Sequence, residues 1–291
     1  MKVVGIPSIE NISDTARWVA VYRAMETERP DAIFRDPFAR RLAGQRGEEA
    51  VNSIPRARAM AWAMIVRTAV FDEIILATIA SKGIDTVLNL AAGLDARPWR
   101  LELPPALRWI DVDLPEILHY KTQGLRDEEP RCRYEAVEAD LTVDAQRRSV
   151  LERAAEQSQK ILVVTEGLLI YLTEEQVGNL AADLASVPAF GWWIIDLASP
   201  RLIKWMSRSW GKHVAAGNAP FRFAPSDGTD FFRRFGWREV DYRSFMVDAR
   251  RLKREMRGMW LWRFLMRFYP AKRREEMKRL SGLVLLEKTT V

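Results

Sequence analysis

Residues 86–100, TVLNLAAGLDARPWR, decide the fold class of this chain. A short apolar run with the length of a buried strand leads into the small residues Ala91, Ala92 and Gly93. Small residues permit a sharp turn and let a ligand come close to the backbone. We therefore predict a strand at 86–90 that ends in a turn suited to ligand binding.

Downstream of this turn, short apolar runs alternate with stretches of helical spacing. Further strands are predicted at 108–112, 134–139, 161–165 and 192–196. Helices are predicted between them at 115–125, 145–157 and 173–186. Because strands that alternate with helices run parallel, this order predicts an α/β fold, a doubly wound sheet with helices on both faces.

The two ends of the chain have different patterns. Before residue 83 we predict a first helix capped by Ser13 or Asp14, a turn and short helix within 28–44, and a long helix at 60–80. In the tail we predict a short helix at 231–235, a strand at 239–245, helical structure at 250–279 and a last strand at 282–288. Late strands after a parallel core indicate an antiparallel edge.

The expected organisation is one domain over 1–291. It has a helical region at 1–82, a ligand-binding core at 83–199, a cap with a late strand at 200–280 and a final strand at 281–291.

Composition excludes several classes of protein. Of the 291 residues, 48% are hydrophobic and 29% are charged, which is unlike a disordered chain. No apolar window approaches the roughly 18 residues of a membrane span, and the first residues lack the pattern of a secretory signal. We therefore expect a cytoplasmic protein without a transmembrane segment. With Cys132, His119 and His213 as the chain's only cysteine and histidines, no zinc site is expected.

Acidic residues follow several of the predicted strands. Asp113, Asp140 and Glu166 each stand directly after a strand, and Asp113 lies about 20 residues beyond the small-residue turn, where an acid is placed to bind ribose hydroxyls. A single carboxylate of this kind is more often a helix cap, but the ordered set favours a ligand site. The glycine motifs of dinucleotide and nucleoside triphosphate sites are absent. The pattern therefore favours an adenosyl ligand without phosphates.

Blocks of sequence from about residue 14 to the C-terminus resemble the bacterial branch of the leucine carboxyl methyltransferase-like O-methyltransferases, which use S-adenosyl-L-methionine. The segments NLAAGLDARPWR and EGLLIYL carry most of the resemblance, with WIDVDLPEILHYK, EADL, FFRRFGWRE and SGLVLLEK in support. The resemblance implies the Rossmann-like class I methyltransferase fold with a helical cap. The family has glycine where Ala91 stands, so the geometry of the turn is expected to differ slightly.

The resemblance also implies a set of cofactor-binding residues. Arg67 would pair with the methionyl carboxylate and Arg17 would add a second contact, since arginine recognises carboxylates well. The remaining assignments place Ala91 and Gly93 at the methionyl group and sulfonium, Asp113 at the ribose, Asp140 and Leu141 at the adenine, and Glu166 near the amino group. Without the resemblance, Arg67 reads as a solvated helix residue.

The acceptor is less defined by the sequence. A carboxylate is ionised at neutral pH and needs no general base, whereas a phenol usually needs one. Tyr171 and His213 are possible acceptor contacts, although a packed tyrosine and a surface histidine are at least as common; His119 reads as a packed or surface residue. The segment 208–232 is equally compatible with a substrate lid and an ordinary insertion. The lack of an evident base favours a carboxylate.

Positive charge is concentrated near the C-terminus. Twelve basic and three acidic residues lie in 250–279, although the net charge of the whole chain is only +6. This segment also contains Trp260, Phe264 and Phe268, so it suits a membrane surface, an acidic partner or a nucleic acid. The expectation favoured here is that the aromatic residues cover the active site while the basic residues face water.

Three functions compete at this point. The leading hypothesis is O-methylation of a small secondary metabolite on a carboxylate or phenol, with no nucleic acid partner. The alternative is methylation of a macromolecule, either a protein C-terminus or a modified tRNA base. The third is a binding module with a degenerate cofactor pocket, which the presence of Arg67, Asp113, Asp140 and Glu166 disfavours.

Overall fold

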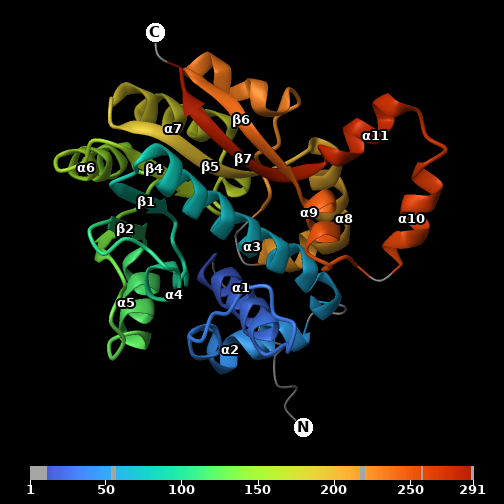
Figure 1. The fold of residues 1–291 in the computed structure, drawn as a ribbon, viewed down its shortest axis with the longest axis horizontal. Helices are drawn as coiled ribbons and strands as arrows, with labels where there is room; N and C mark the ends of the chain where they lie inside the picture. Colours follow the sequence, from blue (N-terminus) through green and yellow to red (C-terminus); the bar gives the residue numbers. More distant parts are fainter. Residues whose placement is uncertain (1–11, 54–56, 217–219, 257, 290–291) are drawn as a thin grey trace.

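The computed structural model describes residues 12–53, 57–216, 220–256 and 258–289. In this part of the chain a seven-stranded sheet has the order β3-β2-β1-β4-β5-β7-β6 (Figure 1). Its strands are β1 (Thr86–Leu90), β2 (Arg108–Asp113), β3 (Arg133–Glu138), β4 (Ile161–Thr165), β5 (Phe190–Ala198), β6 (Trp237–Ser244) and β7 (Ser281–Lys288). Strands β1 to β5 are parallel, and β7 runs antiparallel to both of its neighbours. The predicted doubly wound sheet with an antiparallel edge is confirmed.

Helices cover both faces of this sheet. The N-terminal ones are α1 (Ile12–Thr27), α2 (Ala39–Ser53) and α3 (Ala57–Lys82). Those between the parallel strands are α4 (Arg97–Arg100), α5 (Pro115–Gly124), α6 (Asp144–Ala155), the 3-10 turn η1 (Leu169–Tyr171) and α7 (Glu174–Ser186). The later ones are α8 (Pro200–Ala216), the 3-10 helix η2 (Gly228–Phe235), α9 (Phe245–Arg251), α10 (Met259–Met266) and α11 (Ala271–Lys278).

Two apolar clusters hold the helices on the sheet. On one face α3 packs across the strands, with Phe71 and Ile75 against Val87, Trp109 and Leu162. Strands buried on both faces are apolar throughout, and every residue of β1 and β4 is buried.

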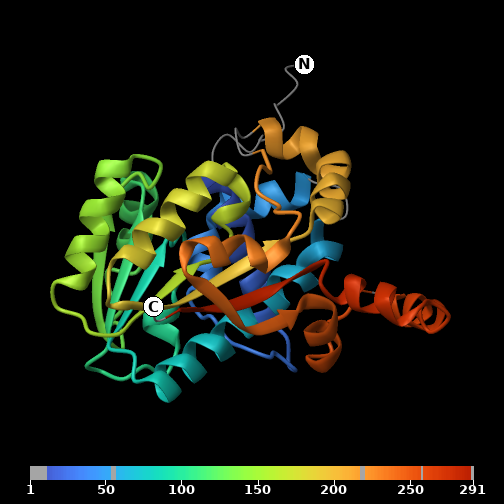
Figure 2. The same ribbon diagram turned by 90° about the horizontal axis from the view of Figure 1, so that it is seen from above.

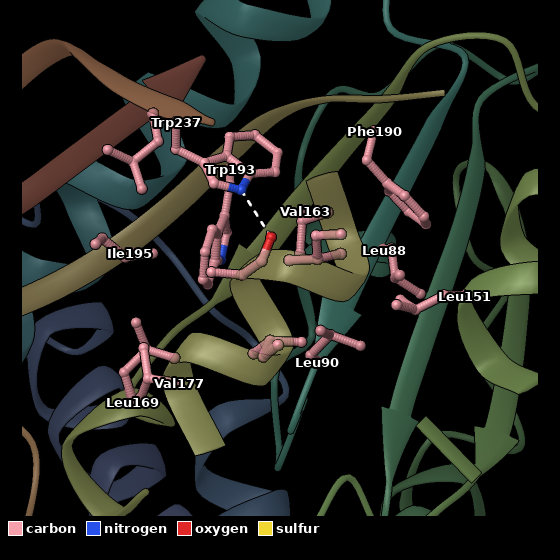
Figure 3. Close-up of a cluster of buried hydrophobic side chains, with 14 of the residues drawn as sticks. Leu88, Leu90, Leu151, Val163, Leu169, Val177, Phe190, Trp193, Ile195 and Trp237 are labelled. Atoms are coloured by element: carbon pink, nitrogen blue, oxygen red, sulfur yellow. Dashed lines mark hydrogen bonds between the residues drawn. The ribbon is translucent and has the colours of Figure 1, made fainter. Parts of the chain in front are cut away.

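On the other face, side chains of α6, α7 and η2 pack against Leu88, Val163 and Trp193. Figure 3 shows this second cluster, in which the indole of Trp193 donates a hydrogen bond of 2.9 Å to Thr165 Oγ1. The indole nitrogen is therefore satisfied inside an apolar core.

A buried ion pair links α5 to the sheet. Lys121 Nζ donates to Asp111 Oδ2, and both side chains are fully buried. The other oxygen of Asp111 accepts hydrogen bonds of 2.9 Å from Asn89 and Trp109. A buried charge is tolerated only when it is paired in this way.

Most predicted boundaries agree with the structure to within a few residues. Strands 86–90 and 161–165 are reproduced without change, and 192–196 is longer because β5 continues to pair with β7 as far as Ala198. The short helix expected within 28–44 is α2, which continues past a kink at Gly44, where φ is 60°. No helix among the described residues is long and apolar enough to cross a bilayer.

The helical structure predicted over 250–279 is present, but it is interrupted. Three separate short helices, α9, α10 and α11, occupy this region. Lys253 and Gly258 have positive φ angles of 55° and 86°, and Pro270 precedes α11. Left-handed residues and a proline both interrupt a helix. The apolar pattern of this segment therefore continues through positions where the helix ends.

Replacing Lys121 by methionine tests the buried pair. Lys121→Met should lower the free energy of unfolding by about 3–5 kcal/mol, because it leaves the Asp111 carboxylate buried without a cation. Urea denaturation measures this change. His119→Ala is the matched control on the same helix, because the His119 side chain is exposed and forms an ion pair with Glu138, which is also exposed. Equal stabilities of the two variants would contradict the assignment.

Candidate active site

The strand register places the predicted ligand residues along one edge of the sheet. Leu90 lies opposite Val112, so the turn that begins at Ala91 faces Asp113. Thr165 lies opposite Ile195, so Glu166 is beside Asp196 of β5. In open α/β sheets ligands bind outside the carboxyl ends of the strands at the point where the strand order reverses, which here lies between β1 and β4.

The turn after β1 is held by the carboxylate of Asp113. Gly93 N donates to Asp113 Oδ2 over 2.6 Å, and Leu114 N donates to Oδ1 over 2.8 Å. Burial raises the pKa of Asp113 above its ordinary value despite these two donors. Each oxygen keeps a lone pair for a further donor such as a hydroxyl. Asp113 therefore both shapes the turn and can bind a ligand.

Two residues of the same turn have a left-handed backbone. Gly93 has a φ of 52°, and a Cβ there would lie 3.2 Å from the Cβ of Ala16 on α1. Ala91 has a φ of 56°, which is unfavourable for a residue with a Cβ. We expected alanine at this position to alter the geometry of the turn. In the structure residue 91 has the left-handed conformation, which is strained for alanine.

A buried arginine is paired with two acids at the ends of β4 and β5. Arg67 Nε lies 2.9 Å from Glu166 Oε1, and Arg67 Nη1 lies 3.2 Å from Asp196 Oδ2. Burial alone would lower the pKa of Arg67, but the two carboxylates outweigh it and raise the pKa. Burial raises the pKa of Asp196 in spite of the arginine. Arg67 is thus not the solvated residue that an isolated reading of its helix suggests.

The backbone is fitted closely to this arginine. Gly167 has a φ of 68°, and a Cβ there would lie 3.1 Å from Arg67 Nη1. Gly167 N also donates to Asp196 Oδ1 over 2.9 Å. Although Arg67 Nε lies within ion-pair distance of Glu166, it is buried and makes no aligned hydrogen bond. Arg67 Nε therefore faces Glu166 Oε1, and a ligand oxygen at this nitrogen would have to displace that contact.

A second arginine ties the turn to α3 and β4. Arg97, which is 2% exposed, contacts Asp72 at 2.6 Å, Asp95 at 2.7 Å and Glu166 at 2.8 Å. Burial would raise the pKa of Asp95, but Arg97 and other nearby cations lower it to about 2. Sequence reasoning missed Arg97, Asp72 and Asp196. The position of Asp196 at the end of a predicted strand was the available signal.

Asp140 and Leu141 lie next to the ribose-binding candidate. Ala139 N donates to the carbonyl of Asp113 over 3.0 Å, so the end of β3 is adjacent to Asp113. The Oδ1 atom of Asp140 accepts from Thr142 N at 2.9 Å and from Thr142 Oγ1 at 2.6 Å. Leu141 packs against the core. The side chain of Asp140 is therefore engaged in a local turn through one oxygen.

Arg17 and Tyr171 approach the site from different sides. The guanidinium of Arg17 lies 3.7 Å from the ring centroid of Tyr120, with no contact to Arg67 among the described interactions. Tyr171 is hydrogen-bonded to Thr15 and lies within electrostatic range of Arg67 and Asp196, and burial raises its pKa. Tyr171 is therefore beside the buried arginine.

Of the two histidines, only His119 has a described side chain, and it takes no part in the described site. His119 is an exposed residue of α5 and contacts Glu138 at 2.8 Å. His213 falls on α8, but its side chain lies outside the described residues. Within the described ranges no cluster of three or more His, Cys, Asp or Glu side chains is arranged to hold a metal ion.

A hollow of about 490 Å³ lies elsewhere, lined by residues that include Arg108, Glu135 and Arg153. It is at the amino ends of β2 and β3, opposite the edge described above. Arg108 and Arg153 are both paired to Glu135 in this hollow. Its position away from the predicted ligand residues separates it from the candidate active site.

Comparison with known proteins agrees with this geometry. The family model for leucine carboxyl methyltransferase matches residues 16–185. A relative from Parafrankia, provisionally named as an S-adenosyl-L-methionine-dependent methyltransferase, is 37% identical over 191 residues. That match covers 62% of this chain and 61% of the relative.

Solved structures match over most of the chain. A DUF574 family protein from Streptomyces avermitilis superposes with a TM-score of 0.58 at 15% identity, covering 92% of this chain and 96% of that one. An O-methyltransferase family protein from Burkholderia thailandensis superposes with a TM-score of 0.51 at 15% identity, covering 86% of this chain and 62% of that one. These matches concern the fold.

The mixed sheet with its antiparallel β7 is the fold of the class I S-adenosylmethionine-dependent methyltransferases. Within that class, the chain belongs to the leucine carboxyl methyltransferase family, whose model matches more than half of its length. The resemblance predicted from the sequence is confirmed.

Restoring glycine at position 91 tests the strained turn. Ala91→Gly should raise the free energy of unfolding by about 1 kcal/mol, because it removes the left-handed penalty while adding some flexibility to the unfolded chain. Ala92→Gly is the matched control, since Ala92 is buried and has no positive φ, and it should destabilise. Chemical denaturation without ligand measures both. A loss of stability in Ala91→Gly would refute the strain.

Proposed function

We propose that this chain is an S-adenosylmethionine-dependent methyltransferase that methylates an oxygen atom of a small organic acceptor. The observation that carries the proposal is the buried arrangement of Arg67 with Glu166 and Asp196, beside the turn held by Asp113. The relatives named as S-adenosyl-L-methionine-dependent methyltransferases support the cofactor and the methyl transfer, and the oxygen acceptor is part of the proposal.

The methionyl group of the cofactor is a zwitterion, and the residues around Arg67 are complementary to it. Arg67 would bind the carboxylate, as arginine commonly does, in place of one of its present acidic partners. Glu166, which already contacts two arginines, would receive the ammonium group. Binding would exchange internal ion pairs for ligand contacts of the same kind, so no charge would be left buried without a partner.

The nucleoside part fits the neighbouring strand ends. Asp113 retains lone pairs for two ribose hydroxyls while its present bonds keep the turn in shape. Ala91 and Gly93 would leave space beside the sulfonium, with Asp140 and Leu141 next to the adenine. Because Asp140 is engaged through one oxygen, its second oxygen is the one that would reach the exocyclic amine. Arg17, which stacks on Tyr120, would need to change rotamer to reach the carboxylate.

The bound cofactor supplies an electrophilic methyl group, and the chain has to align the acceptor and exclude water. Tyr171 lies beside Arg67, and its raised pKa keeps it protonated at neutral pH, so it acts as a hydrogen-bond donor. Asp196 is already committed to Arg67 and Gly167. Neither is a free base, which favours an acceptor that is ionised without help, namely a carboxylate.

Cofactor binding can be tested at Asp113. Asp113→Asn should weaken binding of S-adenosylmethionine by about tenfold or more, since it removes the charge that faces the ribose hydroxyls. Isothermal titration measures the dissociation constant. Asp127→Asn, which changes an exposed acid after α5, is the control and should bind like the parent. Unchanged binding by Asp113→Asn would contradict the ribose assignment, and no binding by the parent would contradict the proposed activity.

The acceptor class can be tested with labelled methyl groups. Transfer from labelled S-adenosylmethionine into a small-molecule extract should give a product that loses its label in mild base, as expected for a carboxyl ester. A base-stable label would indicate a phenol ether instead and would overturn the carboxylate preference. Label in protein or RNA fractions alone would favour the macromolecular alternative.

A further inference from the structure

The helix α10 and the residues after it project from the body of the protein (Figures 1 and 2). We call residues 258–280 the arm. Its large apolar side chains are exposed, contrary to the expectation that they cover the active site. Their exposed fractions are Trp260 67%, Leu261 50%, Phe264 51%, Leu265 51%, Phe268 74% and Tyr269 41%. Monomeric proteins rarely expose so many large apolar residues together, so this surface has a partner.

Four of these side chains lie on one side of α10. Trp260 and Phe264 are spaced by four residues, and Leu261 and Leu265 form a parallel row beside them. At 100° per residue, both rows fall within one continuous stripe. Phe268 lies in the turn that follows the helix. The phenyl rings of Phe264 and Phe268 contact each other edge to face, with centroids 5.6 Å apart. The stripe is on a projecting helix, which presents a convex surface instead of a groove.

Unpaired positive charge accompanies the stripe. Several exposed basic residues of the arm have no carboxylate within ion-pair distance in the described part of the chain. They are Arg267, Lys272, Arg273 and Arg274. By contrast, Arg263, Lys278 and Arg279 are paired with Glu255, Glu275 and Glu239. An apolar stripe bordered by free cations is typical of helices that lie on anionic membranes.

Ion pairs fix the polypeptide just before the arm. Arg254 is buried and pairs with Glu26 of α1 at 2.7 Å. Arg251 pairs with Glu73 of α3 at 2.7 Å. The arm is thus attached to a rigid base formed by the two N-terminal helices.

The arm also leaves the sheet at the edge that carries the candidate active site. It is inserted between β6 and β7, where Ser244 lies opposite Gly282. Ser281 lies opposite Ala198 at the carboxyl end of β5, two residues beyond Asp196. A surface bound by the arm is therefore on the same side of the sheet as Arg67, Glu166 and Asp196.

We propose that the arm docks the protein on an anionic lipid surface, with the active-site edge turned toward the bilayer. The aromatic and leucine side chains enter the interface, and the free cations contact lipid phosphates. A nucleic acid would use the cations and rings but gives no role to Leu261 and Leu265. A second copy would bring two positively charged arms together. Membrane docking does not depend on the proposed methyl transfer.

Vesicle co-sedimentation tests this proposal with the full chain. The protein should bind vesicles that contain phosphatidylglycerol and should bind phosphatidylcholine vesicles much more weakly. Replacing Trp260, Phe264 and Phe268 by serine should reduce binding by about tenfold or more, because the apolar contribution to the interface is lost. Replacing Arg267, Lys272 and Arg274 by glutamine should cause a similar loss at low salt.

Val240→Ser provides the matched control, since Val240 is an exposed apolar side chain of β6 outside the arm, and this variant should bind like the parent. Thermal melts establish that each variant is folded. The proposal would be overturned if the parent did not bind vesicles or bound both vesicle types equally well. It would also be overturned if the aromatic variant bound as tightly as the parent. Retention on RNA without vesicle binding, or a dimer that the aromatic variant dissociates, would assign the arm to those partners instead.

Discussion

The structure depends on keeping two buried arginines neutralised. Arg67 and Arg97 are placed where water cannot solvate them, so each has to meet carboxylates from other elements. Their partners come from α3, from the turn after β1, and from the ends of β4 and β5. Because Glu166 contacts both arginines, it joins the two groups into one network. The network fixes the long helix against the sheet edge and shapes the candidate site at the same time.

The main effect of these ion pairs is to orient the side chains of the candidate site. A buried ion pair contributes little net stability compared with apolar packing, because desolvation offsets much of the attraction. Its value here is orientation, since each guanidinium restricts the side chains around it to one arrangement. The backbone shows the same constraint, with Gly167 in a left-handed conformation against Arg67. A ligand that is itself a zwitterion can replace these pairs without changing the balance of charge.

The fold was largely predictable from the sequence because its strands are buried on both faces. Such strands are short, mostly apolar runs, so 86–90 and 161–165 could be located to the residue. The acids after them could be named because parallel strands end at one edge. Asp196 was missed because it was counted as the last residue of the predicted strand 192–196, and only residues after the strands were considered; in the structure β5 continues to Ala198. Asp72 lies within an apolar helix, and only tertiary contacts reveal its role. The breaks at Lys253 and Gly258 were missed because the spacing of apolar residues gives no information on backbone angles.

The insertion point of the arm has a consequence for how this protein can vary. The strands on either side of it, β6 and β7, pair directly with each other, and the arm is part of the connection between them. The described ion pairs of Arg67 and Arg97 are all made with residues outside the arm. The proposed docking surface and the candidate active site are therefore built from different segments of the chain. Descendants of one catalytic scaffold could acquire different destinations by exchanging a single connection.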